Sequence, residues 1–207
     1  MALYPDYTTT ALLKAHLRIA DTADDVALAA AVTAASRVID YECNRQFGST
    51  TAVARFYTYD PVLIEGRWAQ PVFDISATTG LIVAVDEADD GTYSTTMTLG
   101  TDFDLWPYNA LADGRPWTHL VLSSKGTQAF PWSHLGIKVT AAYGWATVPA
   151  AVAQAALIQS ARFFVRRDSA YGVAGSPDLG SEVRLLARLD PDVALLLQSV
   201  KRYWGAV

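Results

Sequence analysis

Hydrophobic positions near the start of the chain recur at helical spacing. Leu28, Val32, Ala35, Ile39 and Cys43 follow one another in steps of three or four residues, and neither glycine nor proline occurs from 23 to 46. This pattern is typical of a helix with one apolar side. It predicts a helix over about 23–46, ~36 Å long.

A shorter helix is expected before it. Leu12, Leu13 and Leu17 supply its apolar positions, and the three threonines at 8–10 can each cap its first turn. Thr22 and Asp25 resemble a weak capping box for the long helix that follows.

The pattern changes in the middle of the chain, where apolar and polar residues alternate in short runs separated by glycine and proline. Such alternation predicts half-buried strands. The expected strands are Val53–Tyr59, Leu81–Val85, Thr92–Leu99, Phe103–Leu105, His119–Leu122 and Ile137–Tyr143. The Asp89-Asp90-Gly91 segment predicts a hairpin turn.

Helical spacing returns after the strands. Pro149 suits a first helical position, and an uninterrupted run leads from it to Arg167. A glycine-containing loop at 171–180 is predicted to be flexible. Asp190 and Pro191 form a cap and first-turn pair that opens a last helix, expected to end near Tyr203.

These elements predict an α+β fold, mainly a helical bundle with an inserted small antiparallel β domain. The expected helical body combines 1–47 with 149–207, and the β domain spans 48–148. Residues 48–148 hold 5 Lys/Arg and 10 Asp/Glu, whereas 149–207 hold 7 and 5. The predicted β domain is therefore acidic, and the C-terminal helical part is mildly basic.

Composition narrows the class of protein. The 207 residues are 51% hydrophobic and 18% charged, with a net charge of −5. This composition supports a folded core and argues against a broad basic face that neutralises DNA phosphates. No apolar run approaches the length of a membrane span, so no membrane partner is expected.

Candidate catalytic and metal-binding residues are few. His16, His119 and His134 lie in different segments without the spacing of a zinc motif. Cys43 falls on the apolar stripe of the long helix, which favours a core side chain over a nucleophile. No serine-nucleophile, dinucleotide or P-loop motif occurs. We therefore predict no catalytic residues, no metal and no cofactor.

An acidic run at 86–91 invites comparison with a calcium loop. Counting from Asp86, the third position is Ala88 and the twelfth is Met97, so the carboxylate that closes such a loop is missing. A solvated hairpin tip is the favoured interpretation.

Two further groups of residues each allow two interpretations. Arg162, Arg166 and Arg167 either stabilise the end of their helix or form a basic contact patch for phosphates or an acidic partner. An aromatic stretch that includes Trp106, Trp117 and Trp132 either packs the β domain or offers a sugar-binding platform, with packing favoured.

Several short motifs, in order along the whole chain, resemble head–tail connector (adaptor) proteins of tailed bacteriophages. They are Tyr7-Thr8, Leu17-Arg18-Ile19, Asp24-Asp25, Ala34–Asp40, Cys43–Phe47, Leu81–Asp86, Asp90–Tyr93, Asp102–Ala110, Asp113–Trp117, Tyr143–Trp145, Val148-Pro149, Arg166-Arg167, Tyr171–Gly175 and Leu189–Val193.

This resemblance implies a structural virion protein rather than an enzyme. Similar proteins form a homo-oligomeric ring of about twelve copies beneath the portal, at the head–tail junction. The ring extends the channel through which double-stranded DNA passes without sequence-specific binding, and offers a platform to a neck, stopper or tail-completion protein. Assembly is expected in the host cytoplasm, and the final location is the neck of the virion.

The same resemblance assigns portal binding to the last segment of the chain. These residues are Lys201, Arg202, Tyr203, Trp204, Gly205, Ala206 and Val207. Trp204 is either an anchor in a partner's groove or a side chain that folds back on its own core.

Two alternatives are kept. One is a carbohydrate- or host-binding module that uses the aromatic stretch around Trp106 and Trp117. The other is a hydrolase whose unrecognised site includes His119 or His134.

Overall fold

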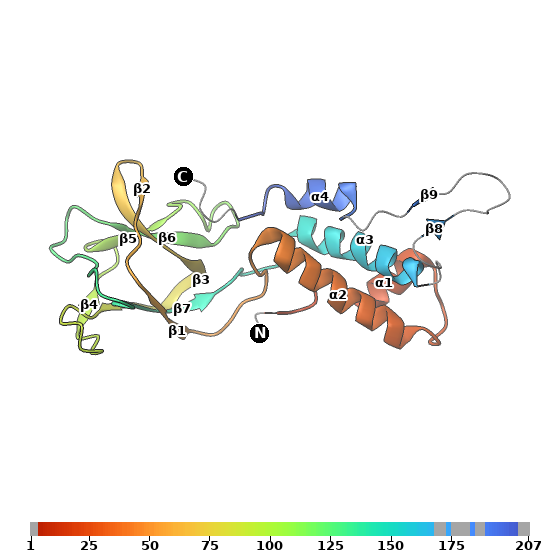
Figure 1. The fold of residues 1–207 in the computed structure, drawn as a ribbon, viewed down its shortest axis with the longest axis horizontal. Coiled ribbons are helices and arrows are strands. Elements are labelled where there is room, and N and C mark those ends of the chain that lie inside the picture. Colours follow the sequence, from red (N-terminus) through yellow and green to blue (C-terminus); the bar gives the residue numbers. More distant parts are fainter. Residues whose placement is uncertain (1–3, 168–172, 175–182, 185–188, 203–207) are drawn as a thin grey trace. The chain divides into compact units, whose positions relative to one another are not determined.

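The computed structural model describes residues 4–167, 173–174, 183–184 and 189–202. The described residues form four helices and, in the middle of the chain, an antiparallel sheet of seven strands. Figure 1 shows how these elements are arranged. The predicted α+β class is confirmed. None of the described helices combines the length and hydropathy needed to cross a bilayer.

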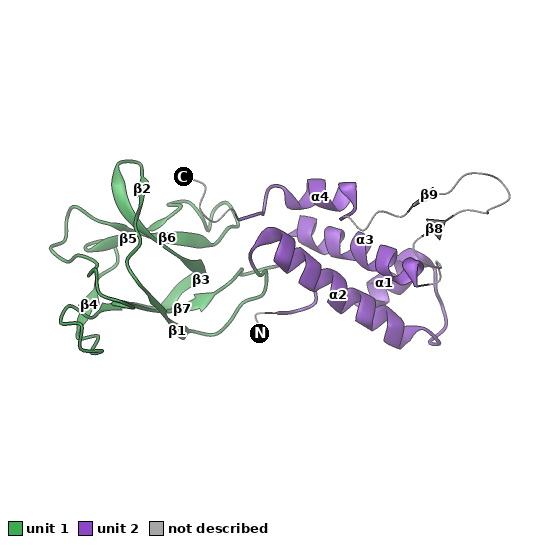
Figure 2. Cartoon of the chain, viewed as in Figure 1, with its two compact units in different colours: residues 1–3, 46–147, 205–207 green, residues 4–45, 148–204 purple. Residues whose placement is uncertain are grey.

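The chain divides into two compact units (Figure 2). The strand unit contains residues 46–147, and the helical unit contains 4–45 together with the described residues from 148 onward. The middle of the chain therefore forms the sheet, and the segments before and after it form the helices.

The helical unit consists of α1 (Thr10–Leu17), α2 (Asp25–Cys43), α3 (Ala150–Arg166) and α4 (Pro191–Leu197). Its core forms where α1, α2 and α3 meet, around fully buried Leu13 and Leu28 with Val32 and Phe164. The apolar stripe of α2 faces inward as predicted, including Ile39 and Cys43, both fully buried.

The cap of α1 is as predicted, whereas the bounds of α2, α3 and α4 differ from the predictions. Thr9 caps α1 by accepting from the Leu12 N–H at 3.2 Å, as its residue type suggests. Helix α2 is shorter than predicted at both ends: its N-cap is Asp24, and at the other end Asn44 adopts a left-handed conformation that ends it. Pro149 is the N-cap of α3 rather than its first helical residue, and α4 ends at Leu197 rather than near Tyr203.

The strand unit contains β1 to β7. Their bounds are Val53–Tyr57 (β1), Val62–Ile64 (β2), Arg67–Val85 (β3), Thr95–Met97 (β4), Phe103–Trp106 (β5), Trp117–Leu122 (β6) and Ile137–Tyr143 (β7). The order across the sheet is β1-β7-β3-β6-β5, and β2 and β4 each pair with β3. Strand β7 alternates buried and half-buried residues along its length, as its sequence predicts.

The long strand β3 organises this sheet. The sequence pattern predicts only its last part, Leu81–Val85, because Pro71 and Gly80 interrupt the alternation before it. The structure accommodates them where the pairing of β3 shifts register, after Pro71 and between Ala77 and Ile82. The first part of β3 pairs with β2 and β6, and its last part pairs with β4 and β7.

The acidic run at 86–91, directly after β3, forms a turn that is closed by hydrogen bonds within the run itself. The Asp86 carboxylate, only 4% exposed, accepts from the backbone N–H groups of Asp90 and Gly91, at 3.3 and 2.7 Å. These bonds occupy the carboxylate that a calcium loop would offer to the ion.

A short ladder joins β8 (Val173–Ala174) to β9 (Val183–Arg184). Apart from Val173–Ala174, the loop predicted at 171–180 lies outside the described residues.

Candidate interaction surfaces

The last described residues are joined to the end of α2. The Arg202 N–H donates to the Cys43 carbonyl at 2.9 Å, and the Asn44 side-chain amide donates to the Arg202 carbonyl at 3.3 Å. Lys201 pairs with Glu42 at 3.2 Å. The chain after α4 therefore has a defined attachment point on the helical unit.

Helix chemistry explains this attachment. The last carbonyls of a helix lack intrahelical donors, and the helix dipole favours cations beside them. Arg202 supplies a backbone donor, while the Arg45 guanidinium, near the same helix end, donates to the Val200 carbonyl at 3.1 Å. Of the predicted portal-binding residues, Lys201 and Arg202 thus have structural partners, and 203–207 lie outside the described residues.

The predicted basic patch at the end of α3 is largely neutralised within the helical unit. Arg162 pairs with Asp190, the N-cap of α4, at 3.1 Å. Arg167 pairs with Asp24 at 2.8 Å and lies over the Phe164 ring, 4.1 Å from its centroid. The hydrogen bond from Arg167 lowers the pKa of Asp24 below its ordinary value.

Arg166 differs from these two arginines, because in the described residues it has no ion-pair partner. It is half-buried on the last turn of α3. Of the three arginines, Arg166 is therefore the one without an ion pair to another described residue.

The aromatic residues of the strand unit follow the favoured packing interpretation in part. Trp117 is 7% exposed and belongs to the core, and Trp106 packs edge-on against His119 with centroids 5.3 Å apart. Trp132, by contrast, is 76% exposed. A platform built on Trp106 and Trp117 is therefore wrong, and the exposed aromatic surface lies elsewhere.

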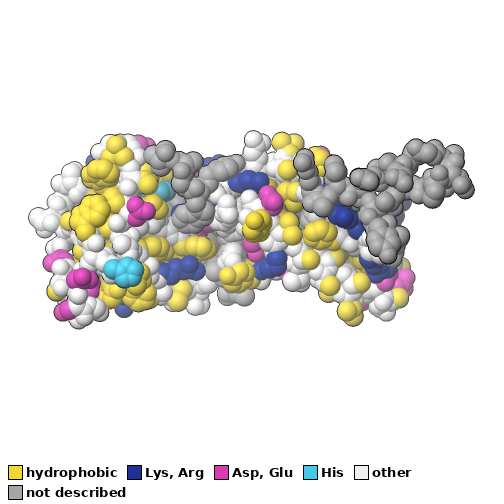
Figure 3. Space-filling view, viewed as in Figure 1, with side chains coloured by type: hydrophobic (Ala, Val, Ile, Leu, Met, Phe, Trp, Pro, Cys, Tyr) yellow, Lys and Arg dark blue, Asp and Glu magenta, His cyan; other side chains and the backbone are white. Residues whose placement is uncertain are grey.

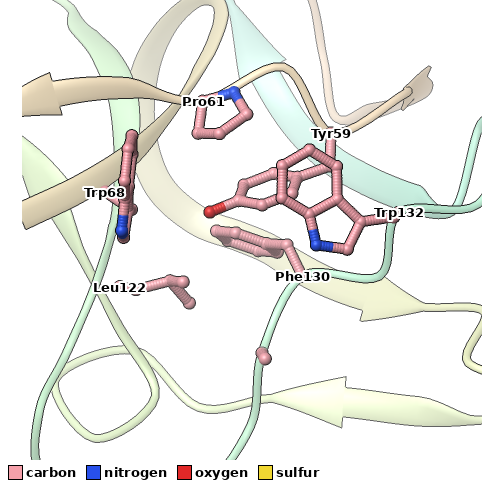
Figure 4. A pocket seen from close by; sticks show the side chains of 7 residues that line it. Tyr59, Pro61, Trp68, Leu122, Phe130 and Trp132 are labelled. Carbon is pink, nitrogen blue, oxygen red and sulfur yellow. The ribbon is translucent and has the colours of Figure 1, made fainter.

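That surface is a pocket of about 280 Å³ in the strand unit (Figure 4). Trp68 and Trp132 stand on opposite sides of it, with Tyr59 and Phe130 between them. The complete lining is Tyr59, Pro61, Trp68, Leu122, Ala129, Phe130 and Trp132. The sequence signal for an exposed Trp68 is its place beside the Glu65-Gly66 hairpin turn.

The predicted core role of Cys43 agrees with its burial. Its side chain is fully buried, and this burial raises the pKa of the thiol to about 12. A nucleophilic cysteine needs the opposite shift.

The histidines do not assemble into a reactive group. His16 and His134 are exposed, and His134 shares a 3.3 Å hydrogen bond with Thr58. His119 contacts the hydroxyl of its neighbour Thr118 at 2.8 Å. Within the described ranges, no three His, Cys, Asp or Glu side chains gather as metal ligands.

Comparison with known proteins finds similarity in fold to two solved structures. No family model and no curated protein matches the sequence. Two solved structures match almost the whole chain: the neck of an empty gene transfer agent (GTA) particle computed with C6 symmetry, and the neck of a native GTA particle computed with C12 symmetry. Their TM-scores are 0.53 and 0.52, each at 19% identity, covering 99% of this chain and 96% of the other.

This similarity establishes the fold shared by these chains. It extends over both units, because the matched regions leave almost nothing of either chain uncovered.

Proposed function

We propose that this protein is a structural component of the neck of a phage-like particle, a head–tail connector that forms a ring beneath the portal. The observation that carries the proposal is the full-length similarity to chains of GTA particle necks. The order of the sequence motifs, which resembles connector proteins, supports it independently. A structural role agrees with the protonated, buried Cys43 thiol and the separate settings of the histidines.

The helical unit is proposed as the ring body because it presents large apolar side chains to solvent. On α2, Val26 is 86% and Tyr41 81% exposed, about 22 Å apart along the helix axis. On α3 and α4, Val165 is 57% and Leu195 71% exposed. Two apolar surfaces on different helices suit a head-to-tail contact, in which one surface of each copy covers the other surface of its neighbour.

The proposed channel function agrees with the charge of the chain. With a net charge of −5, the protein lacks the excess of Lys and Arg that would hold many DNA phosphates. Weak attraction lets double-stranded DNA slide through a ring rather than bind to it.

Residues 201–207 are proposed to reach the portal. Their attachment at Lys201 and Arg202 supports this role, because it fixes where the segment leaves the helical unit. A neck, stopper or tail-completion protein is the proposed partner on the other side of the ring.

Native mass spectrometry of the purified chain, alone and mixed with its portal, tests the proposal. A closed ring of about twelve copies, free or on the portal, is expected. A protein that stays monomeric with the portal present contradicts it.

A further inference from the structure

The aromatic pocket of the strand unit has the features of a peptide-binding site. Its floor is made of buried rings, because Tyr59 and Phe130 are 8% and 3% exposed. Its rim is made of exposed rings, because Trp68 and Trp132 are 56% and 76% exposed. Leu63, directly across the β2–β3 hairpin from Trp68, extends the apolar surface with 58% exposure.

The pocket is held in shape by contacts beneath it. The Tyr59 ring packs against Phe130 with centroids 5.5 Å apart and meets Trp132 edge-on at 4.8 Å. The buried Gln70 side chain accepts from the Asp60 N–H at 2.9 Å, which fixes the segment carrying Tyr59 and Pro61. A preformed site avoids much of the ordering cost of binding.

The Tyr59 hydroxyl is the feature that points to an occupant. Figure 4 shows its oxygen directed into the space between Trp68 and Trp132. Among the described residues this hydroxyl makes no hydrogen bond, and its oxygen is not one of the fully buried polar atoms that lack a partner, because it faces the open pocket. It can therefore donate a hydrogen bond to an acceptor that a ligand brings into the pocket.

The volume of the pocket and the residues that line it favour some classes of ligand over others. A volume of about 280 Å³ lies just below the usual range for small-molecule sites. The lining offers aromatic faces, one hydroxyl and two indole N–H groups, and contains no amide or carboxylate side chain of the kind that recognises sugar hydroxyls. An aromatic-lined groove with hydroxyl and indole donors is the kind of site that binds proline-containing extended segments.

The acidic residues near the pocket also determine which charge its ligand should carry. Asp60, which is exposed, adjoins Pro61, and the exposed Glu65 lies in the turn of the hairpin that carries Trp68. Residues 48–148 carry 10 acidic and 5 basic side chains. Figure 3 shows acidic side chains beside the hydrophobic ones on the visible face of this unit. An occupant with basic flanking residues complements this surface.

We propose that the pocket formed by Tyr59, Trp68 and Trp132 binds an extended, proline-containing segment of a partner protein, flanked by Lys or Arg. A proline ring enters between the two tryptophans, and a neighbouring backbone carbonyl accepts a hydrogen bond from the Tyr59 hydroxyl. This inference goes beyond the proposed ring and does not depend on it, because binding to the strand unit is measured whether or not a ring forms.

The test uses the full chain and an array of fluorescent ten-residue peptides, each with one Pro-Pro pair and two flanking arginines. We expect anisotropy titrations to give dissociation constants of about 10–500 µM for the best peptides. Replacing their prolines by alanine should abolish binding, and replacing their arginines by glutamate should weaken it severalfold.

Variants assign the binding to the pocket. Trp132→Ala should weaken binding at least ~10-fold, and Tyr59→Phe, which keeps the ring but removes the hydroxyl, about 5-fold. Tyr108→Ala, which removes a 49% exposed aromatic elsewhere in the unit, is the matched control and should change nothing.

Three results would overturn the proposal. They are the absence of any peptide binding below about 1 mM, peptide binding that Trp132→Ala leaves intact, and binding of cellohexaose or chitohexaose that requires Trp132 while the peptides fail. If native mass spectrometry shows no ring, the peptide-binding result still stands. If no peptide binds, the result on ring formation still stands.

Discussion

The backbone N–H of Arg202 donates a hydrogen bond to the carbonyl of Cys43, the last residue of α2, at 2.9 Å. Val200, 8% exposed, and Leu197, fully buried, precede this bond and anchor the segment after α4 in the helical unit. The proposed portal-binding segment therefore begins at a fixed point on the helical unit. Its attached part, up to Arg202, can be kept in a variant that lacks 203–207.

Deleting 203–207 should leave the monomer as stable as the full chain and abolish attachment to the portal. The contacts of Val200, Lys201 and Arg202 all remain in this variant. We expect a melting temperature within about 2 °C of the full chain in calorimetry and loss of co-sedimentation with portal-containing heads. As a control, deletion from Val200 onward should lower the stability by about 1–3 kcal/mol, because a buried valine and the helix-end bonds are lost. Normal attachment of the shorter deletion would refute the portal assignment.

Substituting Tyr41 or Val26 by glutamate should prevent ring formation. Both side chains are more than four-fifths exposed on α2, so a charge there costs the monomer little, whereas burying it between two copies is unfavourable. Native mass spectrometry should show monomers. Leu111→Glu, at a 58% exposed position of the strand unit, is the matched control and should still assemble. Rings formed equally well by all three variants would exclude the α2 surface from the contact.

Arg166→Glu tests the basic patch. Arg162 and Arg167 already pair with Asp190 and Asp24, so their substitution would also disturb the helical unit. Arg166→Glu should leave the melting temperature nearly unchanged and weaken binding to the portal about 5- to 10-fold at low salt, with a smaller effect at high salt. Arg115→Glu changes the same charge at an exposed position of the strand unit and serves as the control. An unchanged affinity would assign the arginines to the stability of α3 alone.

Cys43 should resist alkylation in the folded protein. Burial raises the pKa of its thiol to about 12, so very little of the reactive thiolate forms at pH 8. Iodoacetamide labelling followed by mass spectrometry should modify Cys43 only after denaturation. The sign of the shift also means that any stability from the neutral buried thiol is lost as the pH rises above the unfolded value near 8.5. Rapid labelling of the native chain would contradict the core assignment.

Gly144→Ala should be among the most destabilising single substitutions in the strand unit. Gly144 has φ +102°, and an added Cβ would collide with the backbone carbonyl of Gly48. We expect a loss of about 3 kcal/mol or more in denaturant unfolding. Gly66→Ala, where φ is +78° but the space is open, separates strain from collision and should cost about 1 kcal/mol.

The regular elements were predictable where side-chain periodicity agrees with burial. The stripe from Leu28 to Cys43 indicates α2, and the alternation at Ile137–Tyr143 indicates β7 with its observed bounds. The N-cap role of Asp190 also follows from local chemistry, since its carboxylate accepts from the Asp192 N–H at 3.0 Å.

Strand β3 and the aromatic pocket required the tertiary structure. Pro71 and Gly80 would end most strands, and β3 continues past them with a shift of its pairing register near each one. Trp68, Tyr59 and Trp132 come from three separate segments, so their convergence depends on the sheet order. The sequence alone thus determined the α+β class, the helices of the flanks, the acidic middle and the buried role of Cys43, because spacing and residue type express them locally. The tertiary structure decided which aromatics are exposed, which arginines are paired and where the last segment is anchored, because those contacts join residues distant along the chain.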